Sequence, residues 1–277
     1  MKTNSTKKFF SDSIFASMPG FISIFLSLFA IPIHLKFAGT THYGQYIFLH
    51  LISSLGLLLN LGIGKITSIN IAKNKNSNRI AYNGIKITLR NCSIVLILII
   101  FFYIANIFLN LIPQESLILM AASILLTIFF VTLESIVVGN RIFQVLMFIN
   151  LFYYGCSFSI PSIFLFLQYY DYQITFLGSL LIKLTVVLFS VIFLVKNNYI
   201  KFHKLKNYTK FKSAKWFSIS LLLIQIYDFA DKYLIKTILG PAALAIYYVP
   251  QQLSGKLTIL SKGFSSVLLP SISHTEQ

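Results

Sequence analysis

The sequence predicts an all-α membrane protein, a polytopic bundle of about eight transmembrane helices. Hydrophobic residues make up 56% of the 277 positions and charged residues only 11%, whereas a soluble domain has about 25% charged residues. Long apolar runs recur along the chain, and about 20 such residues suffice to cross the hydrocarbon core as a helix. Cations outnumber acids by 23 to 7, and they concentrate between the apolar runs.

Eight apolar segments are the expected helices. They lie at about 9–35, 43–64, 91–112, 116–138, 142–168, 172–195, 216–238 and 242–270. The first follows a Lys-rich start but is too long for the core of a signal peptide, so we expect it to be retained as a helix. The segments at 142–168 and 242–270 are long enough to tilt or to project past the bilayer.

The connections between these segments predict the orientation of the chain. Seventeen cations fall before the first segment or in alternate connections, mainly 65–90 and 196–215, whereas the opposite connections hold Lys36. On a soluble chain, a net charge of +16 would suggest a nucleic-acid partner. Here the positive-inside rule explains the charge better. We therefore expect no nucleic acid, and a multi-pass protein whose N-terminus and basic loops are cytoplasmic.

An internal repeat divides the chain. When the sequence is slid by 201 positions, the first hairpin overlays the last two segments. The matched pairs are Gly39 with Gly240, Tyr46 with Tyr247, Ser53 with Ser254 and Gly62 with Gly263. Transporters are often built from duplicated bundles with a site at their interface. We predict a six-helix lobe at 1–200, a basic cytoplasmic connection at 201–215 and the first two helices of an incomplete second lobe at 216–277, so the chain is expected to be a fragment.

The two hairpins also carry a family resemblance. The stretch DKYLIKTILGPAALAIYYVPQQLSGKL, followed by LLPSIS, resembles the seventh and eighth helices of Wzx-type O-antigen flippases. The stretch GTTHYGQYIFLHLISSLGLLLNLGIGKITSINIAK resembles the first outer turn, the second helix and the next cytoplasmic loop of the same proteins. These flippases are polysaccharide transporters of the MATE-like MOP superfamily.

The resemblance implies a function in polysaccharide and lipopolysaccharide biosynthesis. Such a carrier moves undecaprenyl-diphosphate-linked O-antigen repeat units across the bacterial inner membrane by alternating access of two six-helix lobes. No cofactor is expected for this carrier, while the carboxylates considered below predict proton or sodium coupling. Its expected partners are the membrane lipids, an O-antigen polymerase and a chain-length regulator. Members usually have twelve or more spans, whereas eight are expected here.

Three lysines are candidates for binding the diphosphate: Lys183, Lys256 and Lys232. A charge at bilayer depth costs roughly 2.5–3.5 kcal/mol or more, so such a residue is expected to face a cavity or to have a polar partner. Lys183 lies near the middle of its segment, with no acid within seven residues. It is predicted to line a substrate cavity; a structural hydrogen bond between helices is the alternative.

Three acids are candidates for ion coupling: Asp231, Asp228 and Glu134. Asp228 and Lys232 are four residues apart, so they can pair on one helix face. Asp231 would then remain for another helix or for a coupling cation. Glu134 has the alternative interpretation of a structural partner for a neighbouring helix.

Two other functions compete with the flippase. A MATE-like multidrug or cation exporter would favour carboxylates in its cavity. A membrane enzyme that assembles polysaccharide, such as an O-antigen polymerase, would need a large outer loop or a catalytic acid/histidine group. The sequence shows neither, so no catalytic residues and no metal are expected. Cys92 and Cys156 are expected to be packing residues, and the five histidines to be solvated or interfacial.

Overall fold

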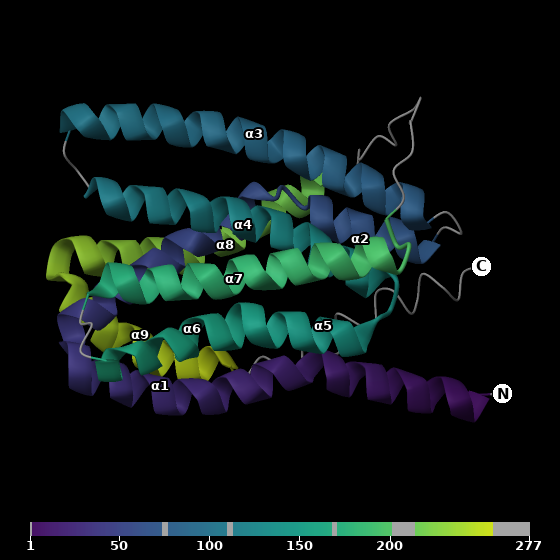
Figure 1. Ribbon diagram of the computed structural model, residues 1–277, viewed down its shortest axis with the longest axis horizontal. Coiled ribbons are helices and arrows are strands. Elements are labelled where there is room, and N and C mark those ends of the chain that lie inside the picture. The colour runs from purple at the N-terminus through teal and green to yellow at the C-terminus, as the bar shows by residue number, and fades with distance from the viewer. Residues whose placement is uncertain (1, 74–76, 110–112, 168–170, 201–213, 257–277) are drawn as a thin grey trace.

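A computed structural model describes the chain except for residues 1, 74–76, 110–112, 168–170, 201–213 and 257–277. Every element in the described part is a helix, and the helices run side by side along the long axis (Figure 1). Five helices there are long and apolar enough to cross a membrane. The chain is a multi-pass membrane protein of the all-α class, as its composition predicts.

Helix α1 (Lys2–Leu59) contains the first two predicted segments. Gly39, with φ 82° and ψ 170°, interrupts its helical conformation. This positive φ is tolerated because glycine has no Cβ. The predicted turn at 36–42 is therefore a local break, at which α1 reverses direction (Figure 1).

Helices α2 (Ile63–Lys73) and α3 (Ser77–Leu109) occupy most of the predicted basic connection at 65–90. The chain bends after α1 at Leu61 and Gly62, which both have positive φ. Contacts with α4 (Gln114–Gly139) hold α2 in place: a Cβ at Gly64 would come within 2.6 Å of Ser135 Oγ. Because α2 buries apolar residues such as Ile66, this segment is helical despite its lysines.

The predicted segment at 142–168 is a helical run whose hydrogen-bond pattern changes three times. It comprises α5 (Phe143–Asn150), the π-helical η1 (Leu151–Cys156), the short α6 (Ser157–Ser159) and the 3₁₀-helical η2 (Ile160–Leu167). Pro161 has no backbone N–H to donate to the preceding turn. The hydroxyl of Tyr46 instead donates to the Phe158 carbonyl oxygen at 2.9 Å.

The sixth predicted segment is α7 (Tyr172–Lys196). Its N-cap is Asp171, whose side chain accepts a hydrogen bond from the Gln173 backbone N–H at 2.9 Å. A carboxylate there satisfies one of the free N–H groups of the first turn. The structure therefore begins α7 at the position that the sequence predicts.

Helices α8 (Ala214–Leu239) and α9 (Pro241–Lys256) form the last hairpin. Gly240 between them has φ 89°, close to the 82° of Gly39. The two glycines that the internal overlay matches thus share a conformation. Residues beyond Lys256 in the predicted segment at 242–270 lie outside the described part of the chain.

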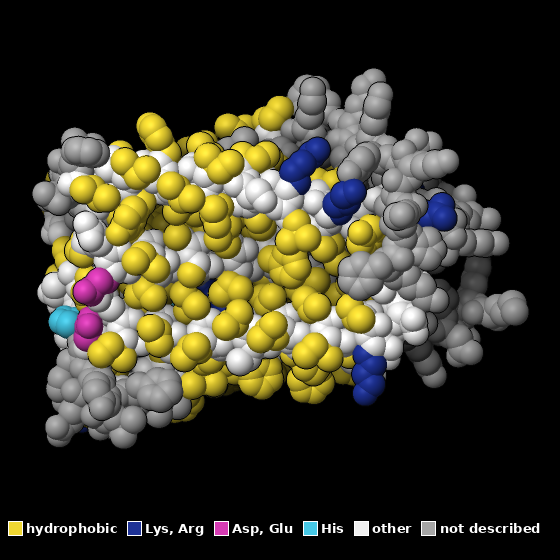
Figure 2. Space-filling view, turned by 45° about the horizontal axis from the view of Figure 1, so that its top comes forward, with side chains coloured by type: hydrophobic (Ala, Val, Ile, Leu, Met, Phe, Trp, Pro, Cys, Tyr) yellow, Lys and Arg dark blue, Asp and Glu magenta, His cyan; other side chains and the backbone are white. Residues whose placement is uncertain are grey.

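The buried core has two main parts. One surrounds Phe130, Leu133 and Leu146; the other surrounds Tyr46 and Phe176 and includes Leu244 and Ala245 of α9. The second hairpin therefore packs on the first bundle. Figure 2 shows hydrophobic side chains over the middle of one face, with Lys and Arg toward the end where the N-terminus lies. This distribution suits a protein surrounded by lipid.

Candidate transport site

Lys183 is buried where three helices of the first bundle meet. Its side chain comes from α7 and is part of a residue that is only 5% exposed. Its Nζ donates to Ser53 Oγ of α1 at 2.9 Å and lies 3.3 Å from Ser123 Oγ of α4. Neutral hydroxyls thus contact the lysine nitrogen in place of water.

Aromatic faces complete the surroundings of this lysine. Its Nζ lies 5.6 Å from the ring centroid of Tyr153 and 5.9 Å from that of Phe176, within the range of cation–π attraction. The Tyr153 hydroxyl donates to Thr127 Oγ1 at 2.9 Å. The described part of the chain provides no carboxylate in an ion pair with Lys183. The contacts are interhelix hydrogen bonds, and diphosphate binding by Lys183 stays a prediction.

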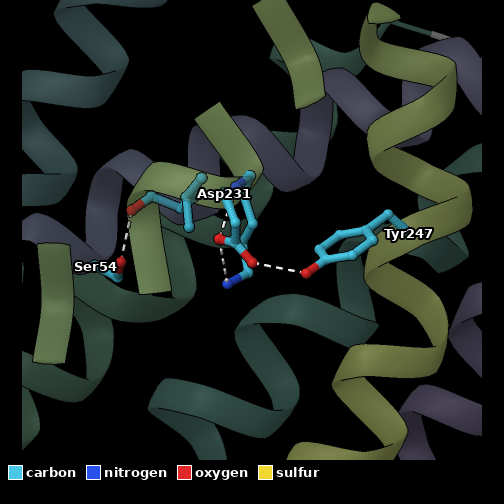
Figure 3. A network of polar contacts seen from close by, with 5 residues as sticks. Ser54, Asp231 and Tyr247 are labelled. Atoms are coloured by element: carbon cyan, nitrogen blue, oxygen red, sulfur yellow. Dashed lines mark hydrogen bonds and ion pairs between the residues drawn. The ribbon is translucent and has the colours of Figure 1, made fainter. Parts of the chain in front are cut away.

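The last hairpin contains a second polar group, centred on Asp231 of α8. Figure 3 shows Tyr247 of α9 pointing at this carboxylate, and its hydroxyl donates to Asp231 Oδ2 at 2.7 Å. Asp231 Oδ1 lies 3.4 Å from the Nζ of Lys232, a residue that is 6% exposed. Because 34% of the Asp231 side chain is exposed, a cation could reach it.

Two predicted site side chains lie outside the described part of the structure. The backbone of Asp228 belongs to α8 and that of Lys256 ends α9, but their side chains are not described. The expected pairing of Asp228 with Lys232 therefore stays a prediction. Tyr247, which sequence reasoning did not assign to the site, is the described partner that joins Asp231 to α9.

Glu134 contacts neighbouring helices. Its Oε1 accepts a hydrogen bond from Asn150 Nδ2 of α5 at 2.9 Å. Burial lowers the pKa of Lys65 in α2, and the negative charge of Glu134 opposes this change. This arrangement suits the structural interpretation of Glu134, while its role in ion coupling stays a prediction.

Several buried polar groups were not predicted. Asp12 Oδ2 lies 3.5 Å from Arg141 Nη2, which ties α1 to the turn after α4. The expectation of solvated or interfacial histidines is wrong for His34, which is 1% exposed. Its Nδ1 lies 3.3 Å from Ser162 Oγ. The sequence around Gly39 does not show which side chains become buried when α1 reverses direction there, so the burial of His34 was not predictable.

No group of three or more histidine, cysteine or acidic residues that could hold a metal ion occurs among the described residues. Cys92 and Cys156 are both free thiols. The polar chemistry of the described site therefore rests on the buried Lys183 with its surrounding hydroxyls, and on the partly exposed Asp231 with Lys232 and Tyr247.

No protein-family pattern and no curated protein matches the sequence. Solved structures do match the fold. A chain designated protein A matches with a TM-score of 0.72 and 14% identity, over 97% of this chain and 65% of that one. An outward-facing multidrug resistance MATE family transporter of the MOP superfamily matches with a TM-score of 0.61 and 16% identity. The match covers 95% of this chain and 64% of that one.

A third match is a MOP superfamily transporter from Pyrococcus furiosus, with a TM-score of 0.60 and 15% identity, over 95% of this chain and 63% of that one. The binding pocket of that transporter is described as having reverse polarity, which suggests a different function for it. This chain thus spans 63–65% of the length of the three structures. At these identities the similarity concerns the fold, and the chain has the fold of MATE-type transporters of the MOP superfamily.

Proposed function

We propose that this chain is part of an alternating-access transporter that flips undecaprenyl-diphosphate-linked O-antigen or related polysaccharide repeat units across the bacterial inner membrane. The MATE-type fold supports a transporter. The likeness of the two hairpins to Wzx-type flippases supports the substrate. In this proposal the N-terminus is cytoplasmic, and an O-antigen polymerase and a chain-length regulator receive the product.

The observation that carries the substrate proposal is the buried side chain of Lys183, which has no carboxylate partner in the described part of the chain. A diphosphate cannot enter hydrocarbon without groups that replace its water. Ser53 and Ser123 hydrogen-bond the Lys183 nitrogen but provide no negative charge, so a protonated Lys183 would have its charge uncompensated. An approaching anion therefore gains attraction from this charge, which is strong in a low-dielectric interior. Lys232 and Lys256 of the second hairpin are the proposed further contacts.

A MATE-like multidrug exporter is the second candidate. One neighbour is described as a multidrug resistance transporter, and the partly exposed Asp231 is the described group that favours a cationic substrate. The Pyrococcus furiosus protein is described with reverse polarity of its pocket. The charge of the substrate-binding pocket is therefore the property that separates the two proposals. In either case, Asp231, Asp228 and Glu134 are the proposed sites of proton or sodium coupling.

The test is a pair of complementation assays with the full-length gene product. Surface O-antigen is measured in a strain without its own flippase, and drug resistance in a strain without its main exporters. Restored O-antigen without drug resistance supports the flippase. Drug resistance without O-antigen supports the exporter and overturns the substrate proposal.

Variants of Lys183 sharpen this assay. Lys183→Met removes the charge and retains most of the length, whereas Lys183→Arg retains the charge. The flippase proposal expects loss of O-antigen display in the Met variant and partial display in the Arg variant. Equal display in both, at equal protein levels in the membrane, would remove Lys183 from substrate binding.

A further inference from the structure

Helix α3 is the least enclosed of the five described membrane spans. In its most apolar stretch only 17% of the residues are buried in the protein, against 28–56% in the other four. The helix lies along one side of the bundle and begins at the end where the N-terminus lies (Figure 1). Much of α3 is therefore exposed to the surrounding lipid.

Three cations lie on one face of the first half of α3. Arg79, Lys86 and Arg90 are all exposed, and their spacing places them within about 40° of one another around the helix axis. Lys86 and Arg90 are one turn apart, or about 6 Å along the axis. The remainder of the helix, residues 91–109, contains no Lys or Arg. The positive charge of α3 is thus confined to one end and to one face.

Arg79 and Arg90 have no acidic partner in the described part of the chain. The ion pairs of that part involve other cations, and residues 77–109 contain no Asp or Glu. Neither arginine is hydrogen-bonded to another described residue. A guanidinium group presents planar N–H donors that match the oxygens of a phosphate. This face of α3 is therefore complementary to a phosphate group.

Beyond Arg90 the same face of α3 is apolar. Ile94, Ile97 and Phe101 lie within about 40° of Arg90 around the axis, and they are 53%, 65% and 73% exposed. A ligand that covers the whole face needs an anionic head beside the cations and hydrocarbon beside these three residues. A soluble acidic protein or a nucleic acid would supply only the first, whereas a phospholipid supplies both.

We propose that this face of α3 binds an anionic phospholipid of the cytoplasmic leaflet. Its phosphate lies between Lys86 and Arg90, and its acyl chains follow Ile94, Ile97 and Phe101. The positive-inside rule accounts for cations near a cytoplasmic connection, but it does not require them to share one helix face. The site is separate from that of the transported substrate, so it applies equally to a flippase and to a drug exporter.

The experiment identifies the lipid that lies beside one chosen position. Lipids with brominated acyl chains quench tryptophan fluorescence at short range, so the full-length protein is prepared with its native tryptophans, Trp216 among them, replaced by phenylalanine. Ile94→Trp then reports on the proposed site. Ile192→Trp is the matched control, because Ile192 is 64% exposed on α7 and lies four residues from a single exposed cation, Lys196, as Ile94 does from Arg90.

Quenching in mixed vesicles gives the binding of phosphatidylglycerol relative to phosphatidylcholine at each position. The relative binding constant is expected to be about fivefold higher for Ile94→Trp than for Ile192→Trp, equivalent to one further cation in contact with the phosphate. Equal constants at the two positions would overturn the proposal, because the general positive charge of that end of the molecule acts on both.

Substitution of single cations locates the head group. In the Ile94→Trp protein, Arg90→Gln is expected to lower the relative binding constant about fivefold, and Arg90→Lys to retain most of it. Lys196→Gln removes the same charge from α7 and is expected to leave the constant unchanged. An unchanged constant in Arg90→Gln would also contradict the proposal.

Salt provides a measurement that needs no substitution of a cation. At about 1 M salt the screening length falls to about 3 Å, so the preference for phosphatidylglycerol at Ile94→Trp should fall toward that at Ile192→Trp. A preference that persists at this salt concentration would assign the site to the shape of the lipid rather than to its charge, and would overturn the proposal. If a melting curve shows that Arg90→Gln is unfolded, this comparison decides the question.

Discussion

Gly44 of α1 packs directly against the carbonyl oxygen of Pro241, the first residue of α9, so closely that a Cβ at position 44 would overlap that oxygen. The contact brings together the starts of two helices that the internal overlay treats as equivalent. Each follows a glycine of positive φ, Gly39 and Gly240. The two corners of the chain at Gly39 and Gly240 therefore meet backbone to backbone.

Gly44→Ala is expected to destabilise the protein by about 1–3 kcal/mol, because an added methyl group must displace backbone rather than a mobile side chain. Gly155→Ala is the control: its Cβ would lie 3.2 Å from Ser23 Cβ, so a small movement accommodates it. The measurement is the thermal midpoint in detergent. Equal midpoints for the two variants would contradict the close approach.

Lys183→Met is expected to leave thermal stability unchanged or to raise it. Replacing a buried charge by an apolar side chain of similar volume removes a desolvation cost. Transport should nevertheless be lost, since functional residues are often kept at the expense of stability. Melting and O-antigen display are measured on the same variant. A large loss of stability would instead identify Lys183 as a structural residue.

The hydrogen bond between Tyr247 and Asp231 is expected to contribute about 1 kcal/mol, below the range for buried charged pairs because the carboxylate is partly exposed. A double-mutant cycle with Tyr247→Phe and Asp231→Asn measures this energy. Tyr227→Phe is the control, as Tyr227 is 80% exposed. Additive effects of the two substitutions would show that the bond contributes nothing.

The Asp231→Asn variant also tests ion coupling. If Asp231 binds the coupling proton or sodium ion, transport by this variant should no longer depend on the ion gradient. Uptake of substrate into inverted vesicles is compared with and without an imposed gradient. Gradient-dependent transport at the level of the parent protein would transfer this role to Asp228 or Glu134.

Stability should depend on pH through Lys65. Burial lowers its pKa below the ordinary value of 10.5, so the unfolded chain binds its proton more tightly than the folded chain does. Stability should therefore rise as the pH increases from the lowered pKa toward 10.5. Lys65→Met should flatten this rise. Glu134→Gln should enlarge it, because the opposing negative charge is removed. Melting curves over that alkaline range provide the check.

The length of an apolar run predicted a helix well where the whole helix lies within the membrane. Helices α4 and α7 begin and end within a few residues of their predicted bounds. Helix α2 was missed because its lysine content indicated a loop, whereas its contacts with α4 depend on Gly64. Those contacts join residues distant in sequence, and hydropathy does not record them.

The candidate site was predictable only in its charged members. Lys183 and Asp231 stand out because each is a charge within an apolar run. Their partners, Ser53 and Tyr247, are ordinary membrane-helix residues. Only the rotation of each helix about its axis brings these hydroxyls into contact with the charges. A single sequence contains little information about that rotation.

The hydroxyl of Tyr46 takes the place of the N–H that Pro161 lacks, since it donates to the Phe158 carbonyl oxygen. In hydrocarbon, that oxygen has no water with which to replace Tyr46. Separation of α1 from the helical run at 143–167 would therefore leave the Phe158 carbonyl oxygen without this hydrogen bond in a nonpolar medium. These two segments are therefore expected to move together.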